Sequence, residues 1–384
     1  MTTLTLDTRA VRAGLENCDV TGAVVPPLHL SSTYAFRGFG DKRKYDYSRS
    51  GNPTRDLLAV ALRDLAGGAG AVFTGSGMGA ITLVGHILTI GARVIVPHDC
   101  YGGTFRLFSA WKKRGELDVE FVDFGNPTAV STALSKPAAL VWIETPSNPL
   151  LRITDIADIS RRAHAVGALV AADNTFLSPG WQQPLALGAD IVVHSTTKYI
   201  NGHSDVVGGA VIAAGAEVAD QLGWWANCLG LTGSAFDSYL TLRGLRTLHV
   251  RLREHGRNAQ AVAEFLTQQE NVKRVYFPGL TTHAGHDIAK RQQSGFGAIV
   301  TIEVAGGIDG AKRFAEALEL FTLAESLGGV ESLVAHPGTM THAAMVPEAR
   351  AAAGLVDGLL RLSVGIESTE DLLNDLANGI EALG

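Results

Sequence analysis

Short, nearly continuous runs of apolar residues recur along the first half of the chain. Runs of this kind are typical of strands that are covered on both faces, as in a parallel sheet. Between them lie segments whose apolar residues recur at helical spacing. This alternation predicts an α/β domain built around a mostly parallel sheet. The predicted strands are residues 71–73, 93–97, 138–144, 168–173 and 190–195, and the predicted helices are 55–68, 81–88 and 153–167.

The two ends of the chain follow other patterns. Residues 1–55 contain the pair Pro26-Pro27 and a polar, aromatic stretch but no long helical period, which predicts an extended arm that packs outside its own domain. Residues 56–256 are then the α/β domain, and residues 257–384 are a smaller α+β domain. The elements predicted in this last part are a long helix at its start, a strand at 296–304, a helix at 311–321, a strand at 359–367 and a helix at 371–384.

Composition and charge exclude several classes of protein. The 384 residues are 46% apolar and 18% charged, as expected of a folded globular protein. With 32 basic and 38 acidic residues the formal net charge is −6, and no basic run is present, which argues against a nucleic-acid or anionic-membrane partner. No stretch approaches the ~20 apolar residues of a membrane span, and the first residues lack the apolar core of a signal peptide. A cytoplasmic protein is therefore expected.

Neither a disulfide framework nor a metal site is expected. The three cysteines are odd in number, far apart and without C-x-x-C spacing. His336 and His342 are six residues apart, which matches no helical spacing of metal ligands.

Polar segments follow each predicted strand directly. In a parallel sheet, ligands bind in the crevice beyond the carboxyl ends of the strands, so these segments together predict one site. They are residues 74–79, 98–103, 144–149, 173–176 and 194–199.

The first of these segments, Thr-Gly-Ser-Gly-Met-Gly, lies between a strand and a helix. Its glycines allow consecutive backbone N–H groups to surround a phosphate at the helix N-terminus. A dinucleotide-binding turn, matched as far as Gly75, Gly77 and Ala80, is one alternative, and an ordinary glycine turn is another. A nucleotide P-loop is excluded because no Gly-Lys-Ser/Thr follows. The segment therefore predicts a phosphate site without identifying the ligand.

Lys198 and Asp173 are the residues that point most directly to a particular chemistry. A lysine held near the interior of the sheet loses hydration, which lowers its pKa and frees its amine to bond with an aldehyde. A buried carboxylate at a neighbouring strand end needs a cationic partner, and the protonated pyridine nitrogen of pyridoxal phosphate is one. The alternatives are a surface lysine and an aspartate that caps a helix. If the protein were a nucleotide-dependent oxidoreductase, Lys198 would have no role in its chemistry.

Two further residues have both a functional and a structural interpretation. Tyr101 could stack on a flat cofactor or be an ordinary core tyrosine. Arg361 lies in an apolar strand, where it could bind a substrate carboxylate through two hydrogen bonds or form an ion pair within the protein.

Three motifs together resemble a known family. Ser-Thr-Thr-Lys-Tyr-Ile-Asn-Gly-His-Ser-Asp-Val-Val-Gly-Gly at 195–209, Ala-Asp-Asn-Thr-Phe at 172–176 and Glu-Thr-Pro-Ser-Asn-Pro at 144–149 are similar to those of the Cys/Met-metabolism enzymes that use pyridoxal phosphate. The resemblance covers essentially the whole chain. It implies the aspartate-aminotransferase-like fold (fold type I) in a homotetramer of two tight dimers, with active sites shared between subunits.

The resemblance also implies roles for individual residues. Lys198 would bond covalently to the cofactor, Asp173 would pair with its ring nitrogen, and Tyr101 would stack on its ring. The phosphate would be held by Gly77, Met78, Ser195 and Thr197, and by Tyr47 and Arg49 of the arm, which reach it from the neighbouring subunit. The substrate would be bound by Arg361, Asn148 and Ser326 at its α-carboxylate, by Glu325 at its distal amino group, and by Arg106 and Asp46 in the outer pocket.

Within the family, the stretches at 99–108, 224–247, 323–333 and 341–354 are most similar to bacterial cystathionine γ-synthases. The implied reaction is γ-replacement, in which O-succinyl-L-homoserine and L-cysteine give L-cystathionine and succinate, with small amino acids as the only partners besides the subunits. A cystathionine γ-lyase and a sulfhydrylase that uses sulfide are the alternatives. The sequence leaves the acyl group open between succinyl and acetyl.

Overall fold

The computed structural model describes residues 4–15, 20–341, 350 and 353–384. Its larger sheet has seven strands in the order β1-β7-β6-β5-β4-β2-β3. Strand β7 is antiparallel to β1 and β6, and every other neighbouring pair is parallel. The five predicted strands are confirmed, whereas β3 and β7 were not predicted. The strands are β1 (Gly70–Thr74), β2 (Ala92–Pro97), β3 (Leu117–Val122), β4 (Leu140–Glu144), β5 (Leu169–Asp173), β6 (Ile191–His194) and β7 (Gly209–Ala213).

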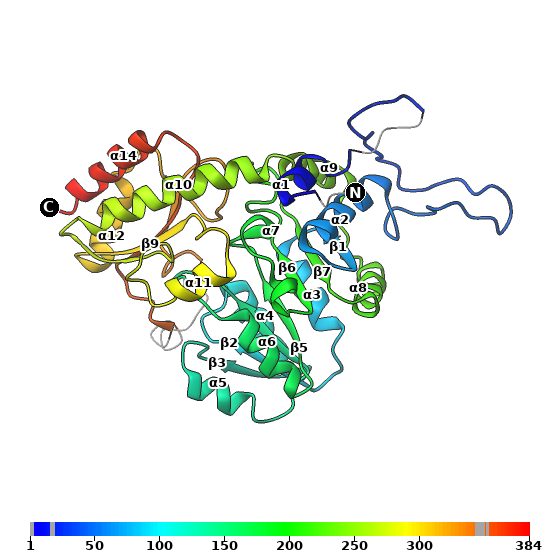
Figure 1. Ribbon diagram of the computed structural model, residues 1–384, viewed down its shortest axis with the longest axis horizontal. Helices are drawn as coiled ribbons and strands as arrows, with labels where there is room; N and C mark the ends of the chain where they lie inside the picture. The colour runs from blue at the N-terminus through cyan, green and yellow to red at the C-terminus, as the bar shows by residue number, and fades with distance from the viewer. Residues whose placement is uncertain (1–3, 16–19, 342–349, 351–352) are drawn as a thin grey trace.

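Helices cover both faces of this sheet, as the continuous apolar strands predicted (Figure 1). Trp142 of β4 packs into one apolar cluster with α3, α4 and α8, and its neighbour Ile143 packs into another with α5 and α6. The three predicted helices correspond to α2, α3 and α6. The helices around this sheet are α1 (Leu6–Val11), α2 (Pro53–Ala66), α3 (Gly77–His86), α4 (Gly102–Arg114), α5 (Pro127–Ala133), α6 (Ile156–Ala165), α7 (Ser178–Trp181), a 3-10 helix (Pro184–Leu187), α8 (Ala216–Leu229) and α9 (Ala235–Leu245).

The smaller sheet has five strands in the order β10-β11-β12-β9-β8 and is mainly antiparallel. The predicted strands at 296–304 and 359–367 correspond to β9 and β12. The elements of this part are α10 (Leu248–Thr267), β8 (Val272–Tyr276), α11 (His286–Gln292), β9 (Ile299–Val304), α12 (Gly307–Glu316), β10 (Thr322–Leu323), β11 (Leu333–Ala335), β12 (Leu359–Ser363) and α14 (Thr369–Glu381).

The helix predicted at 311–321 is displaced toward the N-terminus, because α12 ends at Glu316. The buried carboxylate of Asp375 in α14 accepts the backbone N–H groups of Glu319, Leu320 and Phe321, at 2.7, 3.0 and 3.0 Å. These N–H groups are therefore not available for helical hydrogen bonds. No local sequence pattern indicates a hydrogen-bond partner that lies more than 50 residues away.

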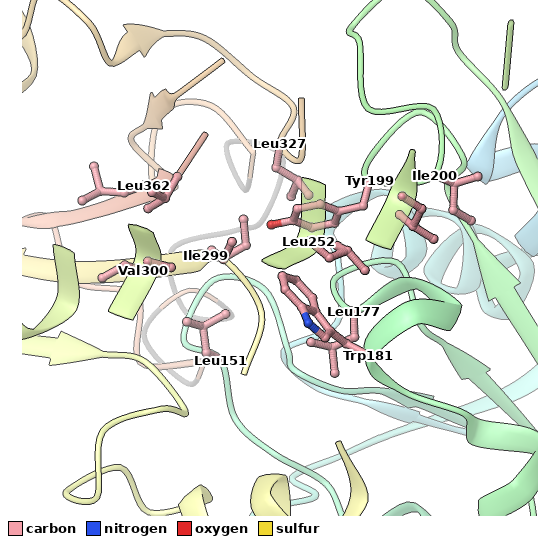
Figure 2. Close-up of a cluster of buried hydrophobic side chains, with 14 of the residues drawn as sticks. Leu151, Leu177, Trp181, Tyr199, Ile200, Leu252, Ile299, Val300, Leu327 and Leu362 are labelled. Carbon is pink, nitrogen blue, oxygen red and sulfur yellow. The ribbon is translucent and has the colours of Figure 1, made fainter. Parts of the chain in front are cut away.

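One apolar core joins the two sheets. It contains Phe73 and Ile212 of the larger sheet together with Val300 and Leu362 of the smaller one. Figure 2 shows its central region. Helix α10 runs without interruption through the predicted boundary at residue 256, so the position of the boundary between domains stays a prediction.

The N-terminal arm extends away from the rest of the chain as the long blue excursion in Figure 1. Within it, only isolated bridges pair Thr33 with Tyr47 and Gly38 with Asp41. Its apolar side chains are largely exposed, and the phenyl ring of Phe39 is fully so. Residues 1–55 are not extended throughout, because Leu6–Val11 form helix α1 and Ala10 is buried in the shared apolar core. That the rest of the arm packs on another chain stays a prediction.

No helix in the described part of the chain is both long and apolar enough to cross a membrane. Among the described residues, no cluster of three or more His, Cys, Asp or Glu is placed to hold a metal ion, and His342 lies outside them.

We predict that Gly244→Ala destabilises the fold by about 2 kcal/mol, because the new Cβ in α9 would collide with the carbonyl oxygen of Asn201. The matched control is Gly223→Ala in α8, where a Cβ has no neighbour within 4 Å. That variant should be stabilised by up to about 1 kcal/mol, because alanine favours helix. Chemical denaturation of both variants measures the difference, and equal stabilities would contradict the packing of α9 on the segment that follows Lys198.

Candidate active site

A cavity of about 460 Å³ lies at the carboxyl ends of β4, β5 and β6. Its far wall comes from the smaller sheet and from the segment that precedes β11. The cavity is lined by the predicted residues Gly77, Met78, Tyr101, Arg106, Asn148, Asp173, Ser195, Thr197, Lys198, Glu325, Ser326 and Arg361. It is also lined by residues that were not singled out individually. Ser76, Glu144, Pro146, Thr175 and Phe176 lie within the polar segments predicted to form the site, whereas Leu327 lies outside them.

Lys198 lies in the turn after β6, with its side chain directed into the cavity. Its Nζ donates a hydrogen bond to Oγ of Ser326, at 2.6 Å. Burial, together with the nearby charge of Arg361 and against the opposing charge of Glu325, lowers the pKa of the Lys198 amine to about 8. The amine is therefore far more often neutral than that of an exposed lysine.

Asp173 ends β5, where it is in register with Glu144 of β4. Burial raises the pKa of the Asp173 carboxyl, and a hydrogen bond from the backbone N–H of Thr175, at 3.0 Å, opposes the rise. Within the described part of the chain no cation pairs with this carboxylate. A bound cationic ring nitrogen would supply the partner that a buried carboxylate needs.

The N-terminus of α3 and the turn after β6 form a cradle on one side of the cavity. Ser76 caps α3 by accepting the N–H of Gly79, at 3.0 Å. A Cβ at Gly77 would lie 2.8 Å from Cβ of Ser195 and 3.0 Å from its Oγ, so only glycine allows this approach. Thr197 is fixed by two hydrogen bonds with the backbone of Gly208, at 3.0 and 3.2 Å. N–H groups at a helix N-terminus beside the hydroxyl of Ser195 fit a phosphate. The hydroxyl of Thr197, which donates to Gly208 here, would have to turn to join them.

Arg361 of β12 lies on the opposite side and is only 3% exposed. Its Nη1 donates to Oδ1 of Asn148, at 3.0 Å, and its Nη2 donates to the carbonyl oxygen of Ser326, at 2.8 Å. Its Nε has no partner among the described residues. Burial lowers the pKa of the guanidinium to about 10. The arginine is thus held by neutral groups, which leaves its charge available for a ligand carboxylate.

Tyr101 precedes α4, and its ring is partly exposed to the cavity. A Cβ at Gly103 would lie 2.5 Å from Cε1 of Tyr101 and 2.7 Å from Sδ of Met78. The absence of a side chain at position 103 therefore allows the ring of Tyr101 to lie across the start of α4.

Asp46, Tyr47 and Arg49 do not line the cavity of their own chain. Asp46 accepts hydrogen bonds from Nζ of Lys42, at 3.1 Å, and from Oγ of Ser50, at 2.8 Å, and Tyr47 is half exposed. That these arm residues reach the site of another subunit stays a prediction.

Comparison with known proteins identifies the family of this chain. The model of the Cys/Met metabolism PLP-dependent enzymes matches residues 7–381. The chain belongs to this family. It is an enzyme of Cys/Met metabolism, its cofactor is pyridoxal phosphate, and the predicted fold is confirmed.

Individual relatives include both synthases and lyases. The cystathionine γ-synthase of Escherichia coli (strain K12) is 57% identical over 98% of this chain and 97% of its own length. A cystathionine γ-lyase of Dictyostelium discoideum is 44% identical over 98% and 97%. The crystal structure of cystathionine γ-synthase from Xanthomonas oryzae pv. oryzae in complex with aminoacrylate and cysteine has a TM-score of 0.98 and 60% identity, over 100% of this chain and 99% of that chain.

We predict that Gly77→Ala weakens the binding of pyridoxal phosphate to the apoprotein by at least about tenfold, because the new methyl group would fill the space between α3 and Ser195. In the control Gly75→Ala, where a Cβ meets nothing within 4 Å, affinity should match that of the wild type. Titration followed by absorbance gives both dissociation constants. If both variants bound the cofactor with equal affinity, the phosphate site would have to lie in another part of the cavity.

A second prediction concerns the pH at which Lys198 reacts. Only the neutral amine attacks an aldehyde, so capture of pyridoxal phosphate by the apoprotein should accelerate as pH rises, with a midpoint of about 8. Stopped-flow absorbance measures the rate. In Lys198→Ala, borohydride reduction should leave no covalently attached cofactor. A midpoint near the pKa of free lysine would contradict the assignment of Lys198 as the reacting amine. Covalent attachment of the cofactor to Lys198→Ala would contradict it as well.

Proposed function

We propose that the enzyme catalyses γ-replacement, in which O-succinyl-L-homoserine and L-cysteine give L-cystathionine and succinate. The likeness of the whole chain to the Escherichia coli cystathionine γ-synthase carries this proposal. The cavity supports it, because cationic and anionic side chains line it at separate points and can receive a substrate that has charges at both ends.

The inner part of the cavity would bind the reacting amino acid. Arg361, held by Asn148 and the Ser326 carbonyl, would bind the α-carboxylate. The amine of Lys198 would take the proton from Cα and then one from Cβ, because it is neutral in a useful fraction of molecules at neutral pH. It would return a proton to each carbon after the sulfur has bonded to Cγ. Bound pyridoxal phosphate supplies the electron sink for these steps. Asp173 would hold the proton on the ring nitrogen.

The outer part would select the leaving group and the thiol. Arg106, with Arg49 of a neighbouring subunit, would bind the succinyl carboxylate. Glu325 would bind the amino group of the incoming cysteine, with Asp46 of the neighbouring arm near it. The bond between Cγ and the ester oxygen breaks and succinate leaves with the electron pair. The cysteine sulfur then bonds to Cγ, and its proton is released.

We also propose that the assembly is a homotetramer of two tight dimers in the cytoplasm. The arm supports this proposal, since a polar, extended segment with exposed apolar side chains gains burial only against another chain. Its residues Tyr47 and Arg49 would contact the cofactor phosphate of the adjacent subunit.

A cystathionine γ-lyase is the second candidate, favoured by the likeness to the Dictyostelium discoideum enzyme. Initial rates distinguish the two. With O-succinylhomoserine and cysteine, formation of cystathionine should be at least about tenfold faster than release of 2-oxobutanoate from cystathionine, a margin that corresponds to about 1.4 kcal/mol in transition-state binding. The reverse ranking would assign the enzyme to the lyases.

A further inference from the structure

Glu144 is a carboxylate in the cavity for which the reaction described above has no use. It is the last residue of β4, directly beside Asp173 in the sheet, and is 6% exposed. Within the described part of the chain it forms no ion pair. Burial raises the pKa of Glu144 well above its ordinary range, and the charge of Asp173 raises it further. Placing a second carboxylate here is therefore costly.

The two oxygens of Glu144 accept backbone N–H groups from two different walls of the cavity. Oε2 accepts the N–H of Tyr101, at 2.8 Å, and Oε1 accepts the N–H of Asn148, at 3.1 Å. These bonds oppose the rise in the pKa of Glu144. Because both oxygens of a carboxyl group have lone pairs that can accept an N–H, Glu144 can fix both backbone segments at the same time, whereas a glutamine amide has only one acceptor oxygen.

Each of these two segments carries a group that faces the ligand. Tyr101 presents its ring to the cavity, and Asn148 receives Nη1 of Arg361 on its Oδ1, at 3.0 Å. A continuous chain of hydrogen bonds therefore runs from the ring wall through Glu144 to the guanidinium. The side chain of Glu144 thus connects the segment that carries Tyr101 with the segment whose Asn148 side chain binds Arg361.

We propose that Glu144 is a positioning residue, whose carboxylate sets the ring of Tyr101 and the Asn148–Arg361 pair at the spacing that the cofactor and the amino acid require. The effect on the Asn148–Arg361 pair, which would bind the amino acid, rests on the proposed function. The part that concerns the ring requires only the cofactor of the family.

The test compares Glu144→Gln with the wild type. The amide keeps one of the two acceptors, so the apoprotein should bind pyridoxal phosphate about tenfold more weakly. The KM for the amino-acid substrate should rise by about tenfold, while kcat changes by less than about threefold. In the Asn148→Ala background the same substitution should no longer raise KM, because the connection to Arg361 is already lost.

Asp375→Asn is the matched control. Asp375 is also a buried carboxylate that accepts backbone N–H groups, but it does not line the cavity. It should lower the melting temperature without changing cofactor affinity or KM. The proposal is overturned if Glu144→Gln behaves like this control, or if KM rises equally in both Asn148 backgrounds.

The role of Glu144 can be tested whether or not the proposed function is correct. KM is measured with whichever reaction the wild type catalyses, synthesis or cleavage of cystathionine. Cofactor affinity needs neither reaction. A wild type that lacks γ-replacement activity would therefore refute the proposed function while Glu144→Gln still tests the role of Glu144.

Discussion

Dehydration of the Lys198 amine is the condition on which the chemistry of this cavity depends. An exposed lysine, with a pKa of about 10.4, is neutral in about one molecule in a thousand at pH 7.5. At the pKa of about 8 that burial produces, about a quarter of the amines are neutral. Ser326 accepts one hydrogen bond from this amine, at 2.6 Å, and thereby orients it. The charge of the buried Arg361 also contributes to the lowered pKa of this amine.

Neither sheet can build this environment alone. Lys198 and Asp173 follow strands of the larger sheet, whereas Arg361 belongs to β12 of the smaller one. The hydrogen bond from Lys198 to Ser326 spans 128 residues of sequence, and that from Arg361 to Asn148 spans 213. Because a shared apolar core joins the sheets, the low exposure of the amine is a property of the whole fold.

The sequence predicted the parts of the site that follow from local pattern. Lys198 and Asp173 stand directly after apolar runs, and parallel strands bring such residues to one edge. Ser326 was expected only through the family resemblance, since no periodic pattern surrounds it. Glu144 was within a predicted segment but was not singled out, because its importance lies in two backbone partners that only the folded chain brings near. Residues 1–55 were predicted as an extended arm, but helix α1 at Leu6–Val11 packs into the core of its own chain, where Ala10 is fully buried.

Helix α10 forms hydrogen bonds with the backbone on both sides of the cavity. Its residues Arg251, His255 and Asn258 lie on one face at spacings of four and three. The buried guanidinium of Arg251 donates to the carbonyl oxygens of the two residues after Lys198, at 2.7 and 3.4 Å. His255 and Asn258 bond to carbonyl oxygens just beyond β12, at 2.7, 3.1 and 2.9 Å. Since one rigid helix holds the backbone behind both cationic groups of the cavity, a shift of either sheet would break buried hydrogen bonds before it opened the site.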